Sequence, residues 1–173
     1  MRLIAFLAAA TVGCVNQSAE NGTVPIGAVE TVTGVPHVVG TDVETWVQLR
    51  TGEGEALRVA GDLEAEVGAL QGARLRLTGA RVDHAGMGQA FHVVDYAILE
   101  IGGETPIVGT LLRVDGDFWI AEPDSVGGQR FQLIGVPSSI GADTGGKIWV
   151  LGMRGSSDIR VQSYGVISRP PGS

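Results

Sequence analysis

One glycine-rich segment has the residue types and spacing of a phosphate-binding loop. Residues 141–147 fit the pattern GxxxxGK, which ends on Lys147. In such a loop a Ser or Thr after the lysine holds magnesium, and the loop opens a helix whose N-terminus faces the phosphate. Here Ile148 replaces the hydroxyl residue, and the residues after it favour a strand. The segment therefore predicts a glycine-rich turn into a strand, without a nucleotide site.

The other candidate catalytic and metal-binding groups are isolated. Asp143, Thr144 and Gly145 have the order of the aspartic protease triplet, but that chemistry needs two aspartates sharing a proton, and the chain has no second triplet. His37 and His92, like His84, lack close ligand spacing and cysteine partners. No serine lies in a GxSxG nucleophile motif. The sequence predicts no catalytic residue, no metal and no cofactor.

The aromatic residues are the best candidates for a binding surface. Residues 118–120 and 148–151 are apolar at successive positions, whereas a half-buried strand alternates between apolar and polar residues. Burial on both faces indicates a junction between two domains, which we favour, or a partner or ligand surface, since tryptophan is enriched at binding hot spots. The residues expected to form this surface are Trp46, Trp119, Trp149, Tyr96 and Tyr164.

The only cysteine, Cys14, follows an apolar N-terminal run. Residues 3–12 are apolar and follow Arg2, but ten residues are half of the roughly 20 that a membrane-spanning helix requires. The run fits the apolar core of a signal peptide. Residues 11–14 resemble the lipobox of bacterial lipoproteins, although Thr11 stands where leucine is usual. The resemblance implies a diacylglycerol-modified Cys14 as the mature N-terminus.

This resemblance implies a location as well as a modification. Residues 1–13 would be the signal peptide, and residues 14–27, which begin with the largely polar run 15–22, a flexible tether. Lipoproteins of double-membrane bacteria that lack Asp after the cysteine usually reach the outer membrane, and Val15 fits that pattern. We therefore expect a lipid-anchored protein of the cell envelope, on the outer membrane and facing the periplasm. The alternative is cleavage after Ala10 and secretion.

The charge of the chain excludes two classes of partner. There are 12 basic and 19 acidic residues, for a net charge of −7. Proteins that bind nucleic acid attract phosphates with clustered lysine and arginine, so nucleic acid is not an expected partner. The chain also has no polybasic patch for anionic lipid head groups.

Four segments of the chain recur in the same order about seventy residues later. The repetition predicts a duplicated structural unit. The paired segments are 46–47 with 119–120, 56–61 with 130–135, 72–79 with 145–152, and 93–98 with 161–166.

The order of strands and helix in the first unit can be predicted from its sequence. Period-two alternation predicts strands, and Leu63, Val67 and Leu70 share one face of a helix that Asp62 would cap. Gly34 and Pro36 interrupt the first strand, which should therefore be an edge strand, bulged or bent. The expected strands are 31–39, 46–50, 56–60, 74–82 and 91–101, with the helix at 62–70.

This order, with one helix between the third and fourth strands, resembles the OB-fold, a small five-stranded barrel. The predicted fold class is all-β with one short helix, as two tandem OB-fold-like barrels. A lipocalin-like barrel or a β-sandwich is the alternative. Barrel 1 would span 28–101 and barrel 2 107–168, joined by 102–106 and followed by a tail at 169–173. In barrel 2 the helix is degraded, and 136–141 should be a loop or one short turn.

These features predict a non-enzymatic, lipid-anchored envelope protein. Its barrels would bind a protein, a glycan or a small ligand, and its contact with the membrane would be the N-terminal lipid. One alternative is a structural or assembly scaffold of the cell envelope. The other is a hydrolase whose site has no recognisable motif.

Overall fold

The computed structural model describes residues 28–41, 43–84, 88–123 and 129–170. The expected signal peptide, the tether and Cys14 lie outside the described residues. Among the residues described, no helix is both long enough and apolar enough to cross a membrane.

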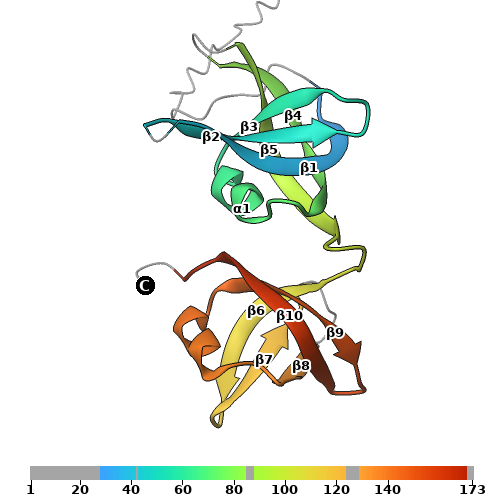
Figure 1. Ribbon diagram of the computed structural model, residues 1–173, viewed down its shortest axis with the longest axis vertical. Coiled ribbons are helices and arrows are strands. Elements are labelled where there is room, and N and C mark those ends of the chain that lie inside the picture. The colour runs from blue at the N-terminus through green and yellow to red at the C-terminus, as the bar shows by residue number, and fades with distance from the viewer. Residues whose placement is uncertain (1–27, 42, 85–87, 124–128, 171–173) are drawn as a thin grey trace, which may run out of the picture.

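The chain is all-β and forms two closed five-stranded barrels in tandem, as predicted (Figure 1). The strand order is β1-β2-β3-β5-β4 in barrel 1 and β6-β7-β8-β10-β9 in barrel 2, so the two barrels share one topology. Barrel 1 comprises β1 (Glu30–Gly40), β2 (Thr45–Thr51), β3 (Ala56–Ala60), α1 (Glu64–Ala69), β4 (Arg74–His84) and β5 (Gly88–Glu100). Barrel 2 comprises β6 (Ile107–Val114), β7 (Asp117–Ala121), β8 (Arg130–Ile134), the 3-10 helix η1 (Ser138–Asp143), β9 (Lys147–Arg154) and β10 (Asp158–Ser168).

Alternation of side chains builds the barrel interior. On β4, Leu75 and Leu77 are fully buried while Arg74 and Arg76 are exposed. Because successive side chains on a strand point to opposite faces, the leucines fill the barrel and the arginines lie outside. Each barrel has its own apolar core, and η1 contributes the buried Ile140 to the core of barrel 2.

The first strand of each barrel bends at a glycine. β1 pairs with β4 up to Gly34 and with β2 from Gly34 onward, so it is bent and is not an edge strand. A Cβ atom on Gly34 would lie 2.5 Å from the Arg50 carbonyl oxygen. Gly109 meets the Ala121 carbonyl in the same way, at 2.3 Å. Both bends therefore require glycine for the close approach of two strands.

The helix α1 differs from the prediction at its start. It begins at Glu64 with Leu63 at the N-cap position, where no side chain makes a capping hydrogen bond, so the assignment of Asp62 as the cap is wrong. The Glu64 N–H instead bonds to the Gly61 carbonyl. Val67 is fully buried, as its spacing predicts.

The two barrels pack against each other. The connection between them is a tight turn through Gly102 and Gly103, both with positive φ, closed by hydrogen bonds between Ile101 and Glu104. Helix α1 lies at the end of barrel 1 that faces barrel 2, against β10 (Figure 1). Ile167 of β10 is buried in the core of barrel 1. The chain is therefore two barrels with a shared apolar junction.

Strand pairing corrects one equivalence between the repeats. Leu49 pairs with Leu57, and Ile120 pairs with Phe131, so Leu49 and Ile120 are the corresponding positions. Gln48 precedes Leu49 and Trp119 precedes Ile120, so Gln48 corresponds to Trp119. Sequence similarity instead pairs Trp46 with Trp119. The slip is two residues, which leaves both tryptophans on the outer face of their barrels.

Candidate functional site

A stripe of three polar or aromatic side chains runs along the outer face of β2. Trp46, Gln48 and Arg50 alternate with the buried Val47 and Leu49. Four residues of strand separate the first member of the stripe from the last, about 13 Å at roughly 3.3 Å per residue. The stripe is therefore longer than one sugar ring or one nucleobase.

Neighbouring strands widen this stripe with cationic groups. Gln48 lies between His37 of β1 and Arg58 of β3 in the strand register. The Arg58 guanidinium lies 5.5 Å from the centre of the Trp46 ring, a cation–π distance. We call these five residues, Trp46, Gln48, Arg50, His37 and Arg58, the β2 face.

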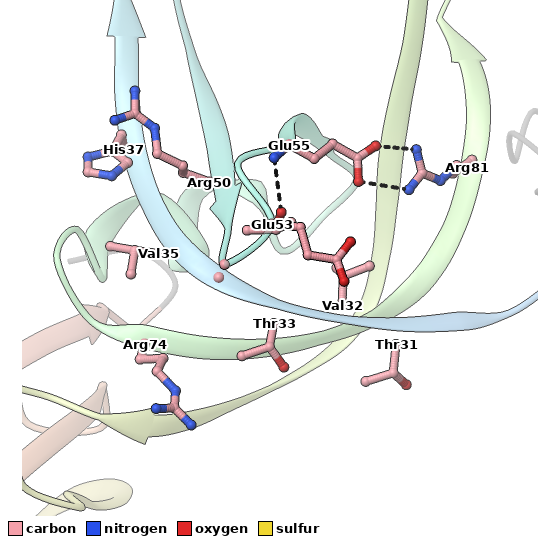
Figure 2. Close-up of a pocket in the computed structure, with 13 residues that line it drawn as sticks. Thr31, Val32, Thr33, Val35, His37, Arg50, Glu53, Glu55, Arg74 and Arg81 are labelled. Atoms are coloured by element: carbon pink, nitrogen blue, oxygen red, sulfur yellow. Dashed lines mark hydrogen bonds and ion pairs between the residues drawn. The ribbon is translucent and has the colours of Figure 1, made fainter.

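The β2 face opens at Arg50 onto a cleft of about 830 Å³. The cleft lies where β1 bends, beside the turn between β2 and β3 (Figure 2). We call it the open cleft. Its lining residues are Thr31, Val32, Thr33, Gly34, Val35, His37, Arg50, Thr51, Gly52, Glu53, Glu55, Arg74 and Arg81.

Two arginines flank β1 inside the open cleft. Val35 pairs with Arg50 on one side of β1. On the other side Gly34 pairs with Leu75, so Arg74 comes next along β4. Arg50 makes no ion pair within the described part of the chain, and Arg74 reaches only Glu100, at 3.6 Å with both side chains largely exposed. Both guanidinium groups are therefore accessible to a ligand.

The third arginine, Arg81, is committed to the rim of the cleft. It contacts Glu55 at 2.8 Å (Figure 2) and Glu30 at 2.8 Å. The hydrogen bond from Arg81 lowers the pKa of Glu55, and its carboxylate partners raise the pKa of Arg81. This ion triplet ties the turn after β2 to β4 and to the start of β1, which holds the mouth of the cleft in shape.

The open cleft is electrostatically divided. Figure 2 shows His37 and Arg50 toward one end, Arg81 with Glu55 at the other, and Glu53 between them. The exposed hydroxyls of Thr31 and Thr33 lie along β1. Such a lining offers cations, a carboxylate acceptor and hydroxyl groups to one ligand.

The position of the arginines is informative because barrel 1 is acidic. Residues 28–101 contain five arginines, no lysine and eleven acidic residues. Four of those arginines lie on the β2 face or in the open cleft. Arginines are thus concentrated on one face of the barrel. Arg81 is paired with Glu30 and Glu55, so Arg50 and Arg74 are the cleft residues that could receive an anionic group.

The aromatic residues singled out in the sequence separate into different places. Trp46 belongs to the β2 face, and Trp149 lies at the junction, packed against the core of barrel 1. Trp149 lies over Gly165, whose Cβ would approach the indole to 2.5 Å. Trp119 is on the outer face of β7, with a buried Nε1 that makes no hydrogen bond to the described residues. Tyr164 packs on the core of barrel 2.

Tyr96 takes part in a polar cluster at the junction. Its hydroxyl donates to Glu66 Oε2, and Lys147 Nζ lies 3.0 Å from the same oxygen. Lys147 also lies 4.4 Å from the centre of the Tyr96 ring. Partial burial opposes the charge of Glu66, but hydrogen bonds from Tyr96, Lys147 and Ser168 outweigh it and lower its pKa. Burial and the Glu66 carboxylate raise the pKa of Tyr96. Lys147 is therefore a junction residue.

The two histidines whose side chains are described lie in different places. His37 lines the open cleft, whereas His92 lies on β5 opposite Ala80. Across the described residues, no group of three histidine, cysteine or carboxylate side chains is placed to hold a metal ion.

Sequence reasoning missed most of the β2 face and the open cleft. It identified Trp46 but assigned no role to Arg50, Arg58 and Arg74. Arg58 alternates with apolar residues in the sequence, and this alternation correctly predicts that its side chain lies outside the barrel. What the sequence lacked was the register, which brings arginines from three strands to one surface.

Comparisons with known proteins add little. No protein-family model matches the chain, and no curated protein is significantly similar to it. Among solved structures, the chain is similar to the one described as the crystal structure of the tetrameric p202 HIN2, with 12% sequence identity over 87% of this chain and 99% of that chain. The TM-score is 0.26, which is too low to support an argument. Any functional assignment must come from the residues of this chain.

Proposed function

We propose that this protein is a lipid-anchored, non-enzymatic binding protein of the cell envelope, and that its β2 face and open cleft bind a saccharide chain. The observation that carries the proposal is the stripe of Trp46, Gln48 and Arg50, which leads directly into the hydroxyl-lined cleft. The fold adds support, because OB-fold barrels bind oligosaccharides and oligonucleotides across the face of their second and third strands.

The chemistry of the β2 face suits sugar rings. A tryptophan presents a flat apolar face to the C–H groups of a sugar, and the cation over the Trp46 ring stiffens that platform. The Gln48 amide and the His37 imidazole both donate and accept hydrogen bonds, which matches the dual character of sugar hydroxyls. The length of the stripe favours an oligomer over a single sugar.

A nucleic acid is the competing ligand, since aromatic and arginine side chains also bind single strands. The stripe opposes it, because single-strand binders stack successive bases on several aromatic side chains, and Trp46 is the one aromatic residue among Trp46, Gln48 and Arg50. An exported protein would also meet glycans more often than nucleic acids. We therefore favour the saccharide.

The saccharide proposal is tested on the Trp46 ring. Trp46→Leu keeps apolar bulk but removes the stacking surface, which should weaken binding of oligosaccharides about tenfold or more, as expected when a tryptophan at a binding hot spot is truncated. Binding is measured by isothermal titration against a panel of neutral and acidic oligosaccharides. Trp119→Leu, the same change on the outer face of barrel 2, should leave the affinity unchanged.

Two results would contradict this proposal. Equal losses in the two variants would mean that the ring does not contact the ligand. Salt-dependent binding of oligo-dT, with no binding of any saccharide, would make the protein a nucleic-acid binder.

The anchor proposal is tested on Cys14, which follows the apolar segment of residues 3–12. Cys14→Ser removes the only thiol that could carry diacylglycerol, so the expressed protein should move from the membrane fraction to the soluble fraction. The measurement is fractionation together with intact mass. A Cys14→Ser protein that still sediments with membranes would show that the lipid is not the anchor.

A further inference from the structure

The open cleft of barrel 1 has a counterpart in barrel 2. The bends at Gly34 and Gly109 correspond, because Gly34 pairs with Leu75 and Gly109 with Ile148. Arg74 directly precedes Leu75 on β4, and Lys147 directly precedes Ile148 on β9, so Arg74 corresponds to Lys147. The counterpart of the open cleft is a space of about 650 Å³ bordered by Lys147 and by residues 106–108 of barrel 2.

Barrel 1 forms one side of this second cleft. Tyr96 of β5 forms one wall, and the Glu66 carboxylate of α1 lies 3.0 Å from Lys147 Nζ. Ser168, which pairs with Lys147 at the end of β10, donates to the same carboxylate. In barrel 2, the cation at this position of the fold thus holds a carboxylate that comes from outside the barrel.

We propose that the open cleft binds the carboxylate of an acidic sugar, so that the saccharide chain contains uronic acid residues. The inference rests on the proposed saccharide function and deepens it. Where barrel 2 has Lys147 and Ala121, barrel 1 has Arg74 and Arg50, on the two sides of Val35. A guanidinium presents a planar fork of donors that matches a carboxylate with two parallel hydrogen bonds.

The corresponding segments of the first strands favour a sugar over a protein in the open cleft. In barrel 2, which docks against protein, this segment is Pro106, Ile107 and Val108. The corresponding residues of the open cleft are Thr31, Val32 and Thr33, with both threonines exposed. Protein interfaces have apolar centres, whereas hydroxyl groups match a hydroxylated ligand.

Glu53 fits the same ligand. Its carboxylate lies between the cationic end and the Arg81 end of the cleft (Figure 2). Beside a simple inorganic anion it would be repulsive, but it can accept hydrogen bonds from sugar hydroxyls. Arg50 and Arg74 lie on different sides of the cleft, so a saccharide chain with more than one carboxylate can offer one to each arginine and a hydroxyl to Glu53 (Figure 2).

The test compares an acidic oligosaccharide with its own neutral form. The probes are hexagalacturonate and its methyl ester, with alginate and hyaluronan fragments covering the other common uronic acids. At least one free acid should bind about tenfold more tightly than its ester, and Arg50→Gln and Arg74→Gln should each remove about tenfold of that affinity. Arg76→Gln, on the same strand as Arg74 but outside the cleft lining, should have little effect.

Each alternative result is distinguishable. If acid and ester bind equally, and Trp46→Leu still weakens both, the saccharide function stands and the carboxylate site is wrong. If no saccharide binds but a peptide of residues 62–71, the α1 segment, binds and loses affinity in Arg74→Gln, the occupant is an acidic protein and both proposals fall. Loss of affinity in Arg76→Gln equal to that in Arg74→Gln would reduce the effect to general charge.

Discussion

The two barrels share a strand order and a bent first strand, yet the corresponding clefts have different surroundings. In barrel 2, β5 of the neighbouring barrel forms one side of the space, and Glu66 of α1 holds Lys147. In barrel 1, the residues that line the cleft all belong to barrel 1, and three of them are arginines. Three substitutions between the repeats account for most of the change: Thr31 to Pro106, Thr33 to Val108, and Arg50 to Ala121. A duplicated fold can thus devote one copy of a surface to its own assembly and leave the other for a ligand.

The outer faces of β4 and β9 differ in the same way: the first is exposed, and the second packs into the junction. Arg76 of barrel 1 is exposed on β4, and its counterpart on β9 is Trp149, which packs into the junction over Gly165. The residue corresponding to Gly165 in barrel 1 is Ala97, opposite Arg76. A glycine is needed only where an indole lies flat on the neighbouring strand. The junction therefore depends on a pair of changes on two adjacent strands.

The largest predicted effect breaks the junction. Ile167 is 5% exposed, in the core of barrel 1, while the corresponding Leu99 of β5 is only partly buried. Ile167→Ala should lower the free energy of unfolding by about 2–5 kcal/mol, through lost burial and a residual cavity. Leu99→Ala should cost about 1 kcal/mol, since less of its surface is removed from water. Denaturant unfolding measures both.

The number of transitions in the unfolding curve tests whether the two barrels unfold together. If the junction couples the barrels, the wild-type protein unfolds in one transition, and Ile167→Ala separates it into two. Equal losses in Ile167→Ala and Leu99→Ala would contradict the shared core.

A smaller effect concerns the polar cluster of the junction. Glu66 and Lys147 are partly buried, with 21% and 34% of their side chains exposed, whereas the Arg74 and Glu100 side chains are 57% and 41% exposed. Glu66→Gln should therefore lower the free energy of unfolding at neutral pH by about 1 kcal/mol. Glu100→Gln should change it by a few tenths at most.

The loss in Glu66→Gln has a defined pH dependence. The folded protein lowers the pKa of Glu66 below its ordinary value of 4.5. A depressed carboxyl pKa contributes stability that is fully present above the unfolded pKa and disappears as the pH falls through the folded pKa. The difference between wild type and Glu66→Gln should therefore be constant from pH 7 to about pH 5.5 and shrink below pH 4.5. A difference that persists at pH 3 would show that the charge of Glu66 is not its source.

Local pattern and repetition determined the fold of this chain. Alternation of apolar and polar residues on 56–60 and 74–82, and the spacing of Leu63, Val67 and Leu70, predicted two barrels and the helix of the first. These features can be predicted from the sequence because each depends on residues that are close together in the chain. The same local signals identified Trp149 as doubly buried, which fits its place at the junction.

Only the tertiary structure decided which surfaces are used. The pairing register placed Arg50 and Arg74 on the two sides of β1, and it shifted Trp119 by two residues from its expected counterpart. Register and docking depend on contacts between residues far apart in the chain, where no local period exists. The sequence by itself determined that there are two similar barrels. The packing of α1 on barrel 2 decided that Lys147 is held by Glu66, whereas the residues that line the open cleft all belong to barrel 1.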